Sequence, residues 1–175
     1  MRQHAGGCVV QEIESENVVM GAIGEPGRRV FYVQIHDADR LVTLTAEKEQ
    51  IVVLAERAIE ALDTIADDVG ADPVEPAPAL ALKPPDTTEF AIGAIGIGFD
   101  EDRDKMLVQF EELLPAETDG DAEPDTIRVF ISRPRLRSVA RHAIEVAKAG
   151  RPACALCGLP EDAGHVCPRG NGHRG

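Results

Sequence analysis

The chain has few aromatic residues, with five phenylalanines, one tyrosine and no tryptophan among 175 residues. Proteins that hold single-stranded nucleic acid stack the bases on aromatic side chains, so this route to nucleic acid is poorly supplied. Basic residues are also outnumbered, because 18 lysines and arginines face 31 aspartates and glutamates, for a formal net charge of −13. Such a charge repels a phosphate backbone and disfavours nucleic acid as a partner.

Long hydrophobic runs are missing as well. No run approaches the ~20 apolar residues of a membrane span, and residues 1–16 have no apolar signal core. We therefore expect a cytoplasmic protein with no membrane partner. Cysteine is scarce too, yet three of the four cysteines fall within residues 154–167. In a reducing compartment, clustered cysteines bind metal or do redox chemistry more often than they form structural disulfides.

The rest of the composition is that of a folded domain. Apolar residues make up 43% of the chain, and a chain of this length buries roughly two-thirds of its unfolded surface without help from a disulfide or a metal. We expect an α+β domain over residues 1–150 and a zinc-binding tail over residues 151–175. Inside the domain, the proline-rich residues 71–88 are expected to form a linker or an extended wrap.

Apolar periodicity predicts the helices and strands of the domain. A long helix is expected with Thr45 as its N-cap and Ile51 in its buried stripe. A second helix is expected after Ser132, with Pro134 in its first turn and Gly150 at its end. The expected strands cover residues 8–13, 18–23, 30–35, 40–44, 89–99, 105–114 and 126–131.

The tetrapeptide GAIG occurs twice, at residues 21–24 and 93–96, and each copy precedes strands and then a helix. This repetition indicates two related strand-strand-strand-helix halves around one mostly antiparallel sheet. The predicted fold class is therefore α+β, with a mostly antiparallel sheet, two long helices and a small C-terminal zinc-binding tail.

The tail, CALCGLPEDAGHVCPRGNGHRG, carries the most specific pattern in the chain. Cys154 and Cys157 form a C-x2-C knuckle, followed by a glycine that lets backbone amides turn toward the sulfurs. With His165 and Cys167 the pattern becomes C-x2-C-x7-H-x-C. Three thiolates and one imidazole are a ligand set that Zn²⁺ accepts in tetrahedral geometry, so the sequence predicts a zinc site.

Two histidines compete for the fourth position. The pattern favours His165, and His173 is the alternative ligand. Four protein ligands would close the site and leave no place for a water nucleophile, so the Zn²⁺ would be structural. A redox cysteine pair would instead open a helix after a strand, whereas this pair follows a helix. We expect Leu156, Leu159 and Val166 to pack the tail against the domain.

Other candidate sites are less specific. Cys8 is expected to be a small buried apolar residue and not a ligand. Arg28 and Arg29 follow a predicted type II turn and offer an anion-binding site, although the glycine loop before them lacks the helix that phosphate loops need. Residues 100–111 imitate a calcium loop, but Lys105 occupies the position at which that loop requires glycine.

The second predicted helix carries the only sizeable basic cluster of the domain. We expect these side chains to pair with the excess of carboxylates in the same chain, although such a cluster also suits an acidic or phosphorylated ligand. The cluster consists of Arg133, Arg135, Arg137, Arg141 and His142.

Several segments together resemble a family of uncharacterised actinobacterial proteins labelled as a domain of unknown function. They are VVMGAIGEPGRRVFYVQ, the EKEQIVVLAERAIEALD helix, and the tail with its CxLCG, GHxCPR and NGHR segments. The resemblance covers most of residues 18–175 and implies that the family's metal-type positions are Cys154, Cys157, His165 and Cys167. It implies no activity. Genes of the family that the chain resembles tend to lie near those of a histidine-phosphatase-like and a lipid-kinase-like protein, so the resemblance implies a phosphate-related partner protein.

Three function classes follow from these patterns. The first is a non-enzymatic interaction or accessory protein with a structural Cys3His zinc site and a protein partner. The second is an enzyme or binding protein for a phosphorylated or anionic small molecule, which requires Arg28, Arg29 and the helix arginines to converge in one pocket. The third is nucleic-acid binding through the tail. The sequence contains no recognisable catalytic constellation and does not decide whether the protein is an enzyme.

Overall fold

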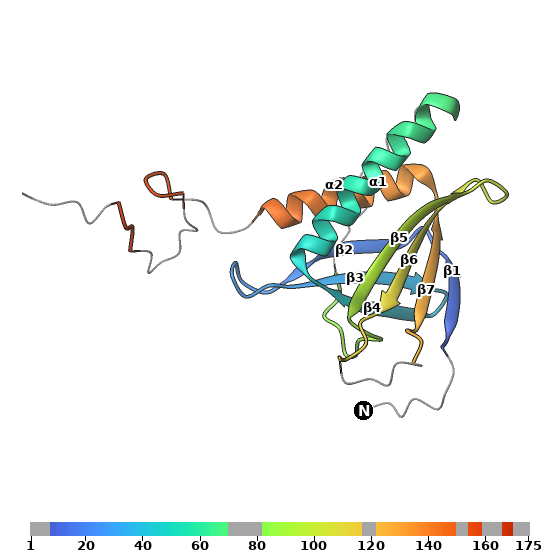
Figure 1. Cartoon of the computed structure of the whole chain (residues 1–175), viewed down its shortest axis with the longest axis horizontal. Helices are drawn as coiled ribbons and strands as arrows, with labels where there is room; N and C mark the ends of the chain where they lie inside the picture. Colours follow the sequence, from blue (N-terminus) through green and yellow to red (C-terminus); the bar gives the residue numbers. More distant parts are fainter. Residues whose placement is uncertain (1–7, 70–81, 117–121, 150–153, 159–165, 170–175) are drawn as a thin grey trace, which may run out of the picture.

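The computed structural model describes residues 8–69, 82–116, 122–149, 154–158 and 166–169. Within these residues the chain forms seven strands and two helices, which confirms the predicted α+β class (Figure 1). The elements are β1 (Val10–Glu14), β2 (Val18–Ile23), β3 (Val30–Asp37), β4 (Arg40–Ala46), α1 (Lys48–Val69), β5 (Ile92–Asp100), β6 (Lys105–Glu112), β7 (Thr126–Ile131) and α2 (Arg133–Lys148).

The strands form two sheets, so the prediction of a single sheet is wrong. One sheet has the order β1-β7-β6-β5 and the other has the order β2-β3-β4. All neighbours are antiparallel except β1 and β7, which are parallel. The short link between β1 and β2 explains the division, because the Ser15 amide bonds to the Phe130 carbonyl and the Asn17 carbonyl accepts from His36. The chain thus passes from one sheet to the other within residues 15–17.

The predicted pseudo-repeat is present at the level of the elements. β2-β3-β4 is an antiparallel meander followed by α1, and β5-β6-β7 is an antiparallel meander followed by α2. The two GAIG segments lie in the first strand of each half, where residues 21–23 end β2 and residues 93–96 belong to β5. β1 is the extra strand and lies at the edge of the second meander.

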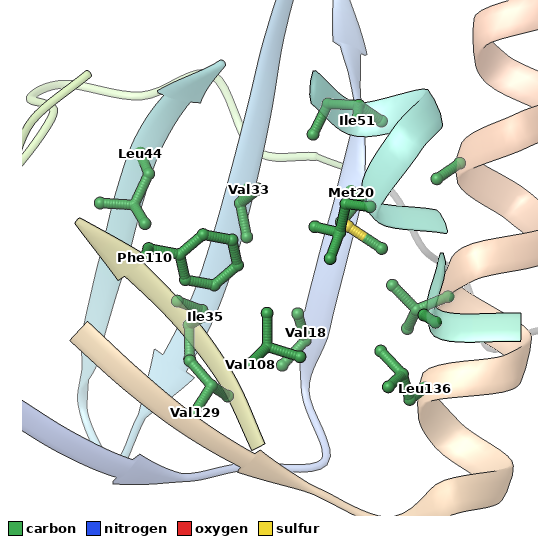
Figure 2. Packing of buried hydrophobic residues seen from close by; sticks show 14 of the residues in the cluster. Val18, Met20, Val33, Ile35, Leu44, Ile51, Val108, Phe110, Val129 and Leu136 are labelled. Carbon is green, nitrogen blue, oxygen red and sulfur yellow. The ribbon is translucent and has the colours of Figure 1, made fainter. Parts of the chain in front are cut away.

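One core fills the space between the two sheets and the helices. Figure 2 shows side chains from β2, β3 and β4 pointing toward side chains from β6, β7 and both helices. Phe110 is 2% exposed, whereas Val33, Ile35 and Leu44 are fully buried. Each such side chain stabilises the fold by about 1.5–3 kcal/mol relative to an exposed one, so the domain needs no metal to hold its core.

Helix α1 begins at Lys48 and not after Thr45, so the predicted N-cap is wrong. Thr45 still belongs to β4 and bridges to Ala91 beside β5. The start of the helix is stabilised instead by the side chain of Gln50, whose Oε1 accepts a hydrogen bond from the Glu47 amide at 2.9 Å. In the described residues neither helix is long and apolar enough to cross a membrane.

Helix α2 begins as predicted, with Ser132 as N-cap and Pro134 in the first turn. The Ser132 hydroxyl does not cap the helix itself and donates to Glu16 Oε2 at 2.5 Å, while the Ser132 amide also donates to that carboxylate. Glu16 further accepts from Lys105 Nζ at 3.3 Å. A carboxylate near the first turn suits the helix dipole, so the β1–β2 link anchors the start of α2.

The end of the proline-rich segment packs on the three-stranded sheet. Leu82 lies 3.2 Å from the position that a Cβ would take on Gly21. The buried side chain of Gln34 accepts from the Lys83 amide at 2.9 Å and donates to the Lys83 carbonyl at 2.7 Å. These contacts support an extended wrap for residues 82–88, while residues 70–81 lie outside the described residues.

Candidate metal centre

The knuckle that carries Cys154 and Cys157 is a tight turn with its own backbone hydrogen bond. The Gly158 amide donates to the Cys154 carbonyl at 2.8 Å. Gly158 has φ +75°, a left-handed conformation that glycine adopts without strain. The glycine that follows the cysteine pair in the sequence is therefore the residue that closes the turn.

The structure brings the three tail cysteines together. The sulfur atoms of Cys154, Cys157 and Cys167 all lie within 4.8 Å of one another, although Cys167 is ten residues from the knuckle in the chain. Cys154 is buried at 7% exposure, and the other two are half-buried. None of the three forms a disulfide. It is the only group of three or more metal-ligand side chains within reach of one ion in the described part of the chain.

This donor set fits a zinc ion. With Zn–S bonds of about 2.3 Å, two sulfurs of a tetrahedral site are about 3.8 Å apart, so sulfurs within 4.8 Å reach a shared ion after small side-chain movements. Three thiolates are soft ligands and favour Zn²⁺ over hard ions such as Mg²⁺ or Ca²⁺. The three cysteines leave one tetrahedral position to be filled by a fourth ligand.

Arg169 joins the two segments of the tail. Its Nη1 donates to the Leu156 carbonyl at 3.1 Å, which ties the turn after Cys167 to the knuckle between Cys154 and Cys157. Sequence reasoning missed this role. The sequence offered one indication of this role. Arg169 follows the third cysteine by two residues, so a long side chain at that position can bond to the backbone of the first cysteine pair.

Both candidate fourth ligands, His165 and His173, lie outside the described residues, and so does Leu159. The expectation that Leu156 and Val166 pack the tail against the domain is wrong, because these side chains are 61% and 70% exposed. The described tail residues lie beyond the end of α2, away from the sheets (Figure 1). The described part of the tail therefore buries little apolar surface.

Cys8 does not belong to the cluster, and the prediction that it is buried is wrong. It is exposed and lies before β1. The carboxylate of Glu123, through a hydrogen bond with the thiol, raises the pKa of Cys8 above its ordinary value of 9.0. A thiol that is harder to deprotonate is a poorer metal ligand. The candidate metal-ligating cysteines are therefore the three in the tail.

Arg28 and Arg29 lie in and after the β2–β3 turn. The type II turn is confirmed, because the Arg28 amide bonds to the Glu25 carbonyl at 2.8 Å and Gly27 has φ +92°. Arg28 is exposed. Arg29 donates to the Val146 carbonyl at 2.9 Å and lies over the Phe31 ring at 5.6 Å, so its guanidinium ties β3 to the end of α2.

Two arginines of the α2 basic cluster pair with carboxylates of the same chain, as expected, while Arg135 is buried and its Nε has no hydrogen-bond partner among the described residues. Arg137 pairs with Asp63 of α1 at 2.6 Å, and Arg133 lies 3.7 Å from Asp104. Both pairs lie near the start of α2, whereas Arg29 contacts its last turn. Arg29 therefore does not converge with Arg133 and Arg137 in the described structure.

The calcium-like segment is a hairpin. Arg103 donates to both carboxylate oxygens of Asp100, and Glu111 lies at the far end of the paired strands, opposite Ala94. These carboxylates do not share a site. The mismatch at Lys105 thus led to the correct interpretation, since this lysine begins β6 and binds Glu14 and Glu16.

Comparison with known families places the chain in one of them. A family model described as a protein of unknown function, DUF3090, matches residues 13–167. The match covers most of the chain, so the protein belongs to this family, and the matched range reaches the last of the three clustered cysteines. No curated protein and no solved structure matches the chain.

Proposed function

We propose that the tail binds one structural Zn²⁺ ion through Cys154, Cys157, Cys167 and His165, and that the protein is a cytoplasmic, non-enzymatic accessory protein. The observation that carries the proposal is the convergence of three cysteine sulfurs within 4.8 Å of one another. A fourth protein ligand closes the coordination sphere, so the ion orders the tail and activates no water.

The physical need for a metal supports a structural role. The tail buries Cys154 but leaves Leu156 and Val166 exposed, so apolar burial contributes little to its folding. The thiolates are not held together in the unfolded tail, so the binding of Zn²⁺ that assembles them supplies folding free energy to such a segment. The domain has its own core, and the tail depends on the ion.

The ligands are tested by measuring zinc in the purified protein and in single variants. We expect one zinc per chain in the wild type and none in Cys154→Ser, Cys157→Ser or Cys167→Ser. His165→Ala is expected to lose zinc, and His173→Ala to keep it. Full zinc in His165→Ala together with loss in His173→Ala would make His173 the fourth ligand, while loss of zinc in neither variant would contradict the Cys3His site.

The accessory role rests on what the ordered tail exposes. Leu156 lies inside the knuckle at 61% exposure, where a bound ion would hold the surrounding turn in place. An exposed apolar side chain next to Arg169 suits a protein partner with an apolar and acidic surface. The family resemblance makes a phosphate-related protein the first partner to examine.

The partner is sought by affinity capture from the native host with two baits. One is the zinc-loaded wild type, and the other is Leu156→Asp, which keeps all metal ligands. A partner retained by the first bait and lost by the second supports the proposal. Partners that bind equally to both baits, or binding of RNA that falls steeply with salt, would contradict a protein-binding role for the knuckle.

A further inference from the structure

The edge of the four-stranded sheet formed by β5 is open beyond its first residues. β5 is the last strand in the order β1-β7-β6-β5. The bridge from Thr45 to Ala91 covers the chain just before β5, and Gln50 Nε2 bonds to the Ile92 carbonyl at 3.0 Å. From Gly93 to Asp100 the described residues place no strand on the outer side of β5.

The composition of β5 is unusual for an exposed edge. Native proteins protect edge strands with charge, proline, short length or a bulge. The opposite edge of the sheet follows this rule, because β1 is five residues long and carries Glu12 and Glu14. β5 is nine residues long, and Ile92–Phe99 reads IGAIGIGF, without charge or proline. A register shift breaks the pairing only at Ile92/Ala94.

An apolar groove lies along this edge. It has a volume of about 770 Å³ and runs between α1 and β5, and Figure 1 shows α1 crossing above β5. Ile95 and Ile97 form its strand side, while Val53, at 55% exposure, lies on the helix side. Arg57 on the rim is paired with Glu60 at 2.7 Å. In the described part of the chain no other strand or helix covers the edge and the groove, whose strand side is apolar and whose helix side combines Val53 with Glu49, Arg57 and Glu60.

We infer that a second copy of this chain covers the surface, with the two β5 strands pairing antiparallel about Gly96. The residue pattern of β5 is self-complementary in this register, because Ile95 lies opposite the partner copy's Ile97, and Ala94 lies opposite the partner copy's Gly98. A two-fold axis at Gly96 keeps the inner faces of both sheets on one side. The α1 helices of the two copies then face each other across the groove, where Val53 and the charged Glu49, Arg57 and Glu60 line the helix side.

The negative net charge of the chain favours an uncharged segment such as β5 as the contact between two copies. The chain carries a net charge of −13, so two copies repel each other over most of their surface. The segment from Ile92 to Phe99 brings no like charges together. The dimer therefore strengthens as salt screens the remaining repulsion, whereas an interface built on ion pairs would weaken.

Gly96 provides a direct probe of the register. A Cβ at Gly96 would meet only Gln109 Cβ at 3.6 Å, and one at Gly98 would meet nothing within 4 Å, so cysteine fits at both positions. In the proposed register the Gly96→Cys residues of two copies are direct neighbours within disulfide reach. Those of Gly98→Cys are about 13 Å apart along the strands, beyond that reach.

The test combines cross-linking with the molecular mass in solution. Under mild oxidation, Gly96→Cys is expected to give about tenfold more covalent dimer than Gly98→Cys or the wild type, which carry the same native cysteines. In sedimentation equilibrium, the wild type is expected to reach twice the 18.8 kDa of one chain and to dimerise more tightly at higher salt.

Two lysine variants separate the interface from folding. Gly96→Lys places like charges opposite each other and is expected to weaken dimerisation by about tenfold or more. Val10→Lys, on the opposite edge β1, is the control that keeps the dimer. A monomer at all concentrations, equal cross-linking of both cysteine variants, or a folded Gly96→Lys protein that dimerises like the wild type would overturn the proposal. So would a bound apolar small molecule that fills the groove of a monomer.

Discussion

The Gly158 amide donates a hydrogen bond to the Cys154 carbonyl, 2.8 Å away, and this bond closes the turn that presents the first two sulfurs of the metal cluster. Gly158 achieves this with φ +75°, and nothing lies within 4 Å of the place where its Cβ would be. A side chain at this position therefore adds backbone strain without a steric clash.

Replacement of Gly158 by alanine is expected to weaken zinc binding. The left-handed conformation costs an L-residue about 1–2 kcal/mol, which corresponds to roughly 5- to 30-fold in affinity. Competition with a chromophoric chelator measures the change. Gly158→Asn is the matched control, because asparagine tolerates this conformation better and is expected to bind zinc more tightly than the alanine variant. Equal affinities for wild type and Gly158→Ala would mean that the turn does not prepare the site.

Gln34 is expected to hold the extended segment after the proline-rich region. It is 1% exposed and satisfies both the amide and the carbonyl of Lys83. Gln34→Ala removes both hydrogen bonds and is expected to lower the free energy of unfolding by about 1–3 kcal/mol. Denaturant titration measures the loss, and hydrogen exchange at Lys83 locates it. Gln11→Ala, which removes a single part-buried contact to Asp37, serves as the control. Unchanged exchange at Lys83 would contradict this assignment.

The ion pair of Glu14 and Lys105 predicts a specific pH dependence. The bond from Lys105 lowers the pKa of Glu14 below its ordinary value of 4.5, and Glu14 raises the pKa of Lys105 above 10.5. The ion pair therefore contributes its full stabilisation between pH 4.5 and pH 10.5, the ordinary pKa values of the two groups. It is lost as the pH falls through the lowered pKa of Glu14 or rises through the raised pKa of Lys105.

NMR titration of the Glu14 carboxyl tests this dependence. In Lys105→Met, the pKa of Glu14 is expected to move up toward its ordinary value. Because Glu14 is on the surface, the change in stability is expected to be small. A Glu14 pKa that is the same in the wild type and in Lys105→Met would show that the pair is absent in solution.

Removal of zinc is expected to affect the tail alone. The core of the domain is formed by both sheets and both helices, and the tail cysteines are not part of it. A chelator is therefore expected to leave the far-UV circular dichroism and the melting temperature of the domain almost unchanged, while residues near Cys154 become sensitive to protease. A collapse of the whole far-UV signal on chelation would show that the domain depends on the metal.

The sequence predicted the elements well because their signals are local. Apolar periodicity located both helices and all seven strands, and the glycine in the β2–β3 turn revealed the type II turn. The number of sheets depends instead on long-range pairing through the Ser15–Asn17 link, which has no local signature. Thr45 was mistaken for a helix cap because its pairing partner, Ala91, lies far away in the chain.

The candidate metal site was partly predictable for the same reason. The C-x2-C spacing with a following glycine is typical of a tight turn. The structure also places Cys167 beside the pair, in agreement with the three predicted cysteine ligands. The surroundings were not predictable. The exposure of Leu156 and the reach of Arg169 depend on how the two tail segments meet in space, and hydrophobicity alone wrongly placed Leu156 against the domain.

The central claim, a closed structural zinc site in the tail, is tested most directly by measuring zinc release and thiol reactivity together on the native protein. We predict one zinc per chain, three tail thiols that a disulfide reagent reaches only after a strong chelator is added, and release of the zinc in step with their modification. The exposed Cys8 is not a ligand, so it reacts without the chelator, at a rate slowed by its raised pKa, and serves as the internal reference. A zinc-free protein whose four thiols all react at the rate of Cys8 would contradict the account.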